Sequence, residues 1–193
     1  GTYEDCFARF QQLQQKHAIE PVTGKVVITL HGLARPKSVM DGLDTYLAEQ
    51  AGYTPINFTY ASTRQSLDDH AAALGKVVGN LDQATRIDFV CHSLGNMVVR
   101  RYLAMCEDDP SGTGIDPRFG RMVMLAPPNQ GAKLAKQFRS NKLVGLLLGP
   151  SCKELGSDWE TCSERFATPS FPFGIMCGTR SLNPLLHQTN DFL

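Results

Sequence analysis

The sequence has no excess of charge of either sign, no long hydrophobic run and no cluster of metal-ligand residues. Its 193 residues carry 19 basic and 19 acidic side chains, so nucleic acid is not an expected partner. No apolar run approaches the length of about 20 residues that crosses a membrane. A hydrophobic fraction of 42% and a charged fraction of 20% are typical of a globular chain with one sizeable core.

The six cysteines show neither a C-x-x-C pair nor a His/Cys spacing typical of a metal site, so we expect no metal ligands. Cys91 and Cys177 lie in apolar runs, which predicts buried thiols. Cys152 and Cys162 flank a polar loop and can pair in an oxidising compartment. The cysteine count does not decide the compartment.

One serine stands between a short apolar run and an amphipathic pattern. The run from Ile87 to Cys91 is typical of a strand, and apolar residues recur at helical spacing from Leu94 onward. A serine on such a turn, here Ser93, is the pattern of a nucleophile elbow, whose strained backbone exposes the hydroxyl. Gly95 supplies the small residue that a close strand–helix approach needs, whereas Cys91 stands where glycine is usual. The alternative is a surface serine that caps an ordinary helix.

Strand and helix patterns alternate along the chain. This alternation predicts a parallel sheet with helices on both faces. Strand patterns occupy residues 25–30, 54–60, 86–91, 121–125 and 173–177, and helical patterns occupy residues 2–19, 38–50, 67–81, 94–105 and 132–138.

Two of these helical patterns carry further expectations. In the first helix Phe7, Phe10 and Leu13 share one face, which predicts a packing role. Ser38 is the expected N-cap of the second helix, which presents an apolar stripe that includes Tyr46. Gly52 is the expected C-terminal signal of that helix, so it should end near residue 50.

The polar and small residues that follow the strands are the candidate site. In parallel sheets such groups gather outside the carboxyl ends of the strands. We therefore expect residues 31–33 (His-Gly-Leu), Ser93, Asn129 and Asp191 to lie along one edge of the sheet. The alternative is that they are scattered loop residues.

Three motifs, in this order, carry a resemblance to a known family. They are His-Gly-Leu at residues 31–33, Cys-His-Ser-Leu-Gly-Asn at 91–96 and Ala-Pro-Pro-Asn-Gln-Gly at 126–131. The sequence over residues 25–193 resembles the α/β-hydrolases and, within that fold, the bacterial lipases and related esterases. The resemblance implies a serine hydrolase that works without metal or cofactor on a small-molecule or lipid ester.

The resemblance also implies a role for each site residue. Ser93 is the expected nucleophile, and the backbone N–H groups of Leu33 and Leu94 are the expected oxyanion hole. Asp191 resembles the acid of the catalytic triad, although Phe192 replaces the glycine that often follows it. His31 in such loops usually has a structural role.

The triad base is the residue that the sequence does not supply in the usual order. The family order is serine, acid and histidine, and no histidine follows Asp191. His92 is too close to Ser93 in sequence to be its base. We expect the chain to continue for roughly 20–50 residues, enough for a strand and helix that bring the histidine. His187 is an alternative base, because geometry and not chain order defines a triad; Asp158 is a weaker candidate acid.

The expected organisation is one α/β-hydrolase-like domain over residues 1–193 that lacks the family's last strand and helix. Residues 24–138 form the core, 139–172 a cap or lid, and 173–193 the last strand and the acid loop. Within the lid region, residues 143–148 either contact acyl chains or a lipid interface transiently or pack on the core. The leading function is a lipase-like or carboxylesterase-like hydrolase; the alternatives are a catalytically degenerate binding module and an acyltransferase or amidase on the same fold.

Overall fold

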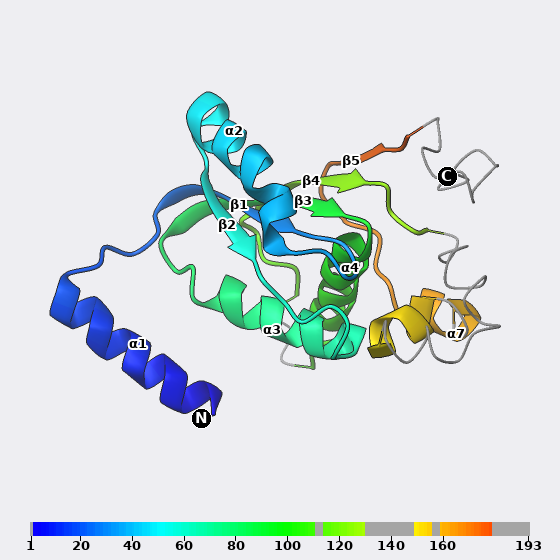
Figure 1. Ribbon diagram of the computed structural model, residues 1–193, viewed down its shortest axis with the longest axis horizontal. Helices are drawn as coiled ribbons and strands as arrows, with labels where there is room; N and C mark the ends of the chain where they lie inside the picture. Colours follow the sequence, from blue (N-terminus) through cyan, green and yellow to red (C-terminus); the bar gives the residue numbers. More distant parts are fainter. Residues whose placement is uncertain (1, 111–113, 130–148, 156–158, 179–193) are drawn as a thin grey trace.

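A single parallel sheet forms the centre of the molecule. The computed structural model describes residues 2–110, 114–129, 149–155 and 159–178 (Figure 1). Its five strands lie in the order β2-β1-β3-β4-β5, and every neighbouring pair is parallel. The strands are β1 (Gly24–Leu30), β2 (Thr54–Phe58), β3 (Ala84–His92), β4 (Phe119–Leu125) and β5 (Phe173–Met176).

Helices lie on both faces of this sheet, as the alternating sequence pattern predicts. Helix α2 covers one face, and α3 and α4 pack side by side on the other (Figure 1). Among the described residues, no helix combines the length and the hydropathy needed to cross a membrane. The helical segments are α1 (Tyr3–His17), the 3-10 turn η1 (Lys37–Met40), α2 (Asp41–Ala51), α3 (Leu67–Gly79), α4 (Leu94–Glu107), residues 149–155 and α7 (Trp159–Ser163).

The core follows from the apolar strands between these layers. Five consecutive residues of β1, from Val26 to Leu30, are buried, which is the pattern of a parallel strand covered on both faces. Phe89 of β3 is 1% exposed, and its ring meets that of Phe119 of β4 edge-on at 5.2 Å between centroids. Leu74 of α3 and Val98 of α4 close the core from one face, and neither is exposed.

The order of the strands creates a topological switch point at the carboxyl end of the sheet. The connection after β1 leads outward to β2, and the connection after β2 returns across β1 to β3. The chain therefore leaves the carboxyl ends of β1 and β3 in opposite directions, and the loops there diverge. The loop at residues 31–33 and the loop at Ser93 both start at this switch point.

Helix α2 differs from its sequence-based expectation at its beginning. A 3-10 turn precedes it, Met40 occupies the N-cap position without a side-chain bond, and Ser38 is exposed. Tyr46, expected on the buried stripe, is 61% exposed. The buried residue of α2 is Asp44, whose carboxylate accepts hydrogen bonds from Thr29 Oγ1 at 2.7 Å and Asn57 Nδ2 at 2.8 Å. These polar bonds to β1 and β2 set how α2 lies on the sheet, whereas Gly52 ends it in the left-handed conformation as predicted.

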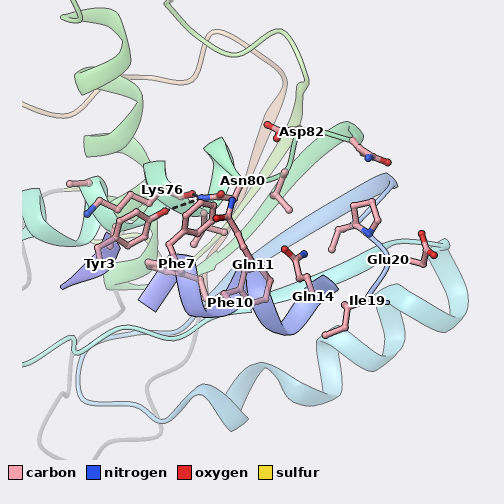
Figure 2. Close-up of a pocket in the computed structure, with 18 of the residues that line it drawn as sticks. Tyr3, Phe7, Phe10, Gln11, Gln14, Ile19, Glu20, Lys76, Asn80 and Asp82 are labelled. Atoms are coloured by element: carbon pink, nitrogen blue, oxygen red, sulfur yellow. Dashed lines mark hydrogen bonds between the residues drawn. The ribbon is translucent and has the colours of Figure 1, made fainter. Parts of the chain in front are cut away.

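Helix α1 also differs from the expected packing role, because none of its residues is buried. It reaches α3 through Tyr3, whose hydroxyl accepts a hydrogen bond from Asn80 Nδ2 at 3.1 Å and whose ring lies 4.1 Å from Lys76 Nζ. Between α1 and α3 runs an open groove of about 960 Å³, with Phe7 and Phe10 on its α1 side (Figure 2). The helix thus stands beside the core instead of completing it.

Cys6, Cys91, Cys106, Cys152 and Cys162 are free thiols. Cys152 and Cys162 are both buried, and the disulfide considered from the sequence is not formed in this structure. Cys91 is fully buried as predicted, whereas Cys177 is half-buried at the end of β5.

A substitution at Gly95 tests how closely α4 approaches β1. A Cβ atom at this position would lie 2.7 Å from Leu30 Cβ and 2.8 Å from the Leu30 carbonyl oxygen. Gly95→Ala should therefore lower the free energy of unfolding by about 1–3 kcal/mol, as overpacking does. Gly79→Ala on α3 is the matched control, because a Cβ there meets no atom within 4 Å and should be neutral or stabilising. Urea unfolding of both variants measures the difference; equal stability of the two would contradict the close approach.

Candidate active site

Ser93 forms the junction between β3 and α4. Its backbone has φ 50° and ψ −115°, a conformation that costs a non-glycine residue of the order of 1–3 kcal/mol. Two donors hold the turn: Ser93 N donates to the Leu125 carbonyl at 2.9 Å, and Asn96 Nδ2 donates to the Ser93 carbonyl at 2.9 Å. The Asn96 amide also reaches the Leu125 carbonyl at 3.2 Å, so it ties the elbow to the end of β4.

The Ser93 side chain does not act as an ordinary helix cap. Its hydroxyl makes no capping hydrogen bond to α4, although the residue stands at the N-cap position. The side chain is half-buried and leaves the N-terminus of α4 open. Cys91, which replaces the usual glycine of the elbow, is 0% exposed, and burial raises the pKa of its thiol well above the ordinary value. Cys91 is therefore a core residue, and Ser93 carries the half-buried hydroxyl of this turn.

The loop after β1 approaches the elbow because residue 32 is a glycine. A Cβ atom at Gly32 would lie 3.2 Å from Ser93 Cβ and 2.9 Å from His92 Nδ1. The next residue, Leu33, is partly buried against the core, and its N–H donates no hydrogen bond within the part of the chain that the structure describes. Leu94 is the first residue of α4, where N–H groups have no partner inside the helix.

Helix α4 adds a favourable electrostatic field at this point. A helix N-terminus carries a partial positive charge that stabilises a nearby negative charge. The N–H of Leu94 and the N–H of Leu33 lie on the two segments that meet at Ser93. The field of α4 favours negative charge close to the Ser93 side chain.

The two histidines near this site, His31 and His92, are not paired with Ser93 in the described part of the chain. His31 is 2% exposed, and its Nδ1 lies 2.9 Å from the Gly32 carbonyl oxygen. Burial, and then the charges of Arg35 and His31, lower the pKa of His92, so its ring is neutral at pH 7. Within the described residues, no histidine ring hydrogen-bonds to the Ser93 hydroxyl. No group of three His, Cys, Asp or Glu side chains in that same part of the chain is suited to a metal ion.

The loop after β4 lies at the same edge of the sheet. It begins at Ala126, whose φ of 46° turns the chain and whose N–H donates to the Met176 carbonyl at 2.8 Å. Asn129 accepts a hydrogen bond from Arg100 Nη1 at 3.0 Å, and Arg100 Nε donates to the Ala167 carbonyl at 2.8 Å. Arg100 of α4 thus connects this loop to the segment that follows α7.

Other sequence-predicted site residues fall outside the described part of the chain. These are the candidate acids Asp158 and Asp191, the candidate base His187, and the apolar piece at residues 143–148. The structure therefore brings together the loop at residues 31–33, Ser93 and Leu94. It also shows that the Asn96 side chain hydrogen-bonds the turn at Ser93 to the end of β4, a role that its place in the motif did not predict.

The sheet order, the switch point and the elbow define the fold as that of the α/β-hydrolases. Solved structures share this fold with the chain at low sequence identity. The phospholipase PlaB from Legionella pneumophila, in complex with thio-NAD, matches 82% of this chain with 38% of its own, at a TM-score of 0.54 and 20% identity. The metagenomic carboxyl esterase MGS0156 matches 75% of this chain with 46% of its own, at a TM-score of 0.53 and 21% identity.

An esterase from Pyrobaculum calidifontis matches 81% of this chain with 58% of its own, at a TM-score of 0.50 and 15% identity. The chain thus spans less than two thirds of the length of each of these three proteins. Over residues 3–157 it matches the model of a family described as a domain of unknown function, DUF7379, and the chain belongs to this family. No curated protein matches the sequence.

One buried histidine, His70, and one half-buried histidine, His92, predict that the protein loses stability on mild acidification. Burial lowers the pKa of His70 and of His92 below the ordinary value of 6.5. The unfolded chain therefore binds protons first as the pH falls below 6.5, and the free energy of unfolding decreases from there downward. His70→Phe should weaken this decrease between pH 6.5 and 5, whereas His17→Gln on exposed α1 should keep it. Urea unfolding at each pH measures the free energy of unfolding. If this free energy depends on pH equally in the wild type and in His70→Phe, the account is contradicted.

Proposed function

We propose that this protein is a serine ester hydrolase of the lipase or carboxylesterase type, with Ser93 as its nucleophile. The observation that carries the proposal is the conformation of Ser93, which is strained, partly accessible and without a capping bond at the N-terminus of α4. The loop after β1 comes so close to this residue at Gly32 that an added Cβ atom would lie 3.2 Å from Ser93 Cβ. A capping serine needs neither feature.

The proposed reaction has two halves that share one oxyanion site. The Ser93 oxygen attacks the carbonyl carbon of an ester, its proton passes to a base, and the carbonyl oxygen becomes an oxyanion. The N–H groups of Leu33 and Leu94 bind that oxyanion, each contributing about 3–4 kcal/mol in comparable sites. The protonated base then gives its proton to the leaving alkoxide, which departs as an alcohol. Water, deprotonated by the same base, releases the acid from the acyl-enzyme and restores the Ser93 hydroxyl.

The base and the acid of this mechanism lie outside the described residues. His31 is committed to the Gly32 carbonyl, and His70 has no exposed surface, so neither can receive the Ser93 proton. We propose a histidine from elsewhere in the protein as base, with His187 as the candidate in this sequence. Asp191 orients that histidine. No metal or cofactor has a part in these steps.

The proposed substrate is a small-molecule or lipid ester. The phospholipase and the two esterases that share the fold support this class of substrate. Residues 139–172 stand as the proposed lid, and the apolar piece at residues 143–148 is the proposed contact with an acyl chain or a lipid interface. No nucleic-acid partner is proposed, because the formal net charge is zero.

The test of this function is the loss of ester hydrolysis on removal of the Ser93 hydroxyl. The full-length protein should hydrolyse a p-nitrophenyl ester, and Ser93→Ala should lower kcat by at least about 1,000-fold, because the acyl-enzyme cannot form. Ser38→Ala is the matched control, since Ser38 is exposed on η1 and should leave kcat unchanged.

A fluorophosphonate probe separates the enzyme from a binding module on the same fold. It should label the wild type and Ser38→Ala, and it should not label Ser93→Ala. Undiminished hydrolysis or labelling of Ser93→Ala would rule out this nucleophile. A full-length protein that neither hydrolyses esters nor reacts with the probe would instead support the non-catalytic alternative.

A further inference from the structure

The loop that carries the proposed oxyanion donor is held by residues 60–67, the segment that follows β2. Tyr60 donates its hydroxyl hydrogen to the His31 carbonyl at 2.5 Å, and Ser62 Oγ accepts a hydrogen bond from the Ala34 N–H at 3.1 Å. Both side chains are buried, with exposed fractions of 9% and 5%. These two bonds fix the loop backbone at His31 and Ala34, on either side of Leu33.

The peptide between Gly32 and Leu33 is fixed by a third bond. The His31 Nδ1 atom lies 2.9 Å from the Gly32 carbonyl oxygen, which can only accept, so this nitrogen carries the hydrogen. In a trans peptide the carbonyl and the following N–H point in opposite directions. Fixing the Gly32 carbonyl therefore fixes the direction of the Leu33 N–H. Ala34, at φ 53°, adds a strained turn that would relax without its bond to Ser62.

We propose that Tyr60 and Ser62 are positioning residues that hold the loop at residues 31–34 in the conformation that aims the Leu33 N–H at the reacting oxygen. This inference rests on the proposed function, in which that N–H stabilises the oxyanion. Neither residue touches the substrate. Both act through the backbone of the loop.

The ring of Tyr60 is itself fixed between two imidazoles. It stacks on His31 with 4.4 Å between centroids and an interplanar angle of 15°, and it meets His70 edge-on at 4.7 Å. Burial raises the pKa of Tyr60 far above its ordinary value, so the hydroxyl stays protonated and remains a donor. His70 is fully buried and its two ring nitrogens have no hydrogen-bond partner among the described residues, which is consistent with a packing role against Tyr60.

The outer side of residues 60–67 is held by the helical residues 149–155 of the proposed lid. Ser151 Oγ donates to the Gln65 carbonyl at 2.8 Å, and Glu154 Oε2 accepts from the Leu67 N–H at 2.9 Å. Gly149 lies so close that a Cβ atom there would be 1.8 Å from the Thr63 carbonyl oxygen. Residues 60–67 thus hydrogen-bond to residues 149–155 on one side and to the loop at residues 31–34 on the other.

The experiment compares the kinetics of three variants of the full-length protein on a p-nitrophenyl ester. Tyr60→Phe keeps the ring and removes one bond, and Ser62→Ala removes the other. Each should lower kcat by about 10- to 100-fold, less than the loss of a direct oxyanion donor, with KM changed by less than about 2-fold. Tyr53→Phe is the matched control: Tyr53 precedes β2 at the amino-terminal end of the sheet and its hydroxyl bonds to Asp88 of β3, so kcat should not change.

The outcomes distinguish this inference from the proposed function. Turnover that survives Ser93→Ala would overturn the function itself. Turnover lost in Ser93→Ala but unchanged in both Tyr60→Phe and Ser62→Ala would overturn only the positioning role. A lower melting temperature with unchanged kcat would likewise mean that the bonds are merely structural. If Tyr60→Phe fails to fold, Ser62→Ala decides, and rates are normalised to folded protein by circular dichroism.

Discussion

The close approach of α4 and the loop after β1 is the constraint on which the site depends. Gly95 lets the first turn of α4 lie against Leu30, and Gly32 lets the loop lie against Ser93. A side chain at either position would push the helix N-terminus and the loop apart. The polar groups at the carboxyl end of the sheet therefore come together because residues 32 and 95 have no side chain. The buried strands β1 and β3 hold these groups on a rigid support.

Backbone strain is concentrated at the same edge of the sheet. Three non-glycine residues with positive φ follow strand ends there: Ala34 after β1, Ser93 after β3 and Ala126 after β4. Each such conformation costs of the order of 1–3 kcal/mol, and it persists only where neighbouring bonds impose it. Here the Asn96 amide, the Ser62 hydroxyl and the Leu125 carbonyl are among the groups that do so. The arrangement resembles a preorganised site more than a set of ordinary connections.

The sequence predicts those features that depend on local pattern. The apolar runs predicted the parallel strands, and the change from strand to helix pattern at Ser93 predicted the tight turn between β3 and α4. The roles of Tyr60, Ser62 and Asn96 were not predictable, because each acts on a carbonyl or N–H of a distant segment and no spacing rule encodes that contact. The predicted start of α2 was wrong for a similar reason. Asp44 hydrogen-bonds to the sheet, and this tertiary contact overrides the preference of Ser38 for the N-cap position.

The central claim is that Ser93 and the N–H groups of Leu33 and Leu94 form one reacting unit. The most direct measurement is a crystal structure of the full-length protein after reaction with diethyl p-nitrophenyl phosphate. The account predicts density continuous from Ser93 Oγ to phosphorus, with the phosphoryl oxygen about 2.7–3.1 Å from both backbone nitrogens. A phosphoryl group attached elsewhere, or one whose oxygen points away from both N–H groups, would contradict the account.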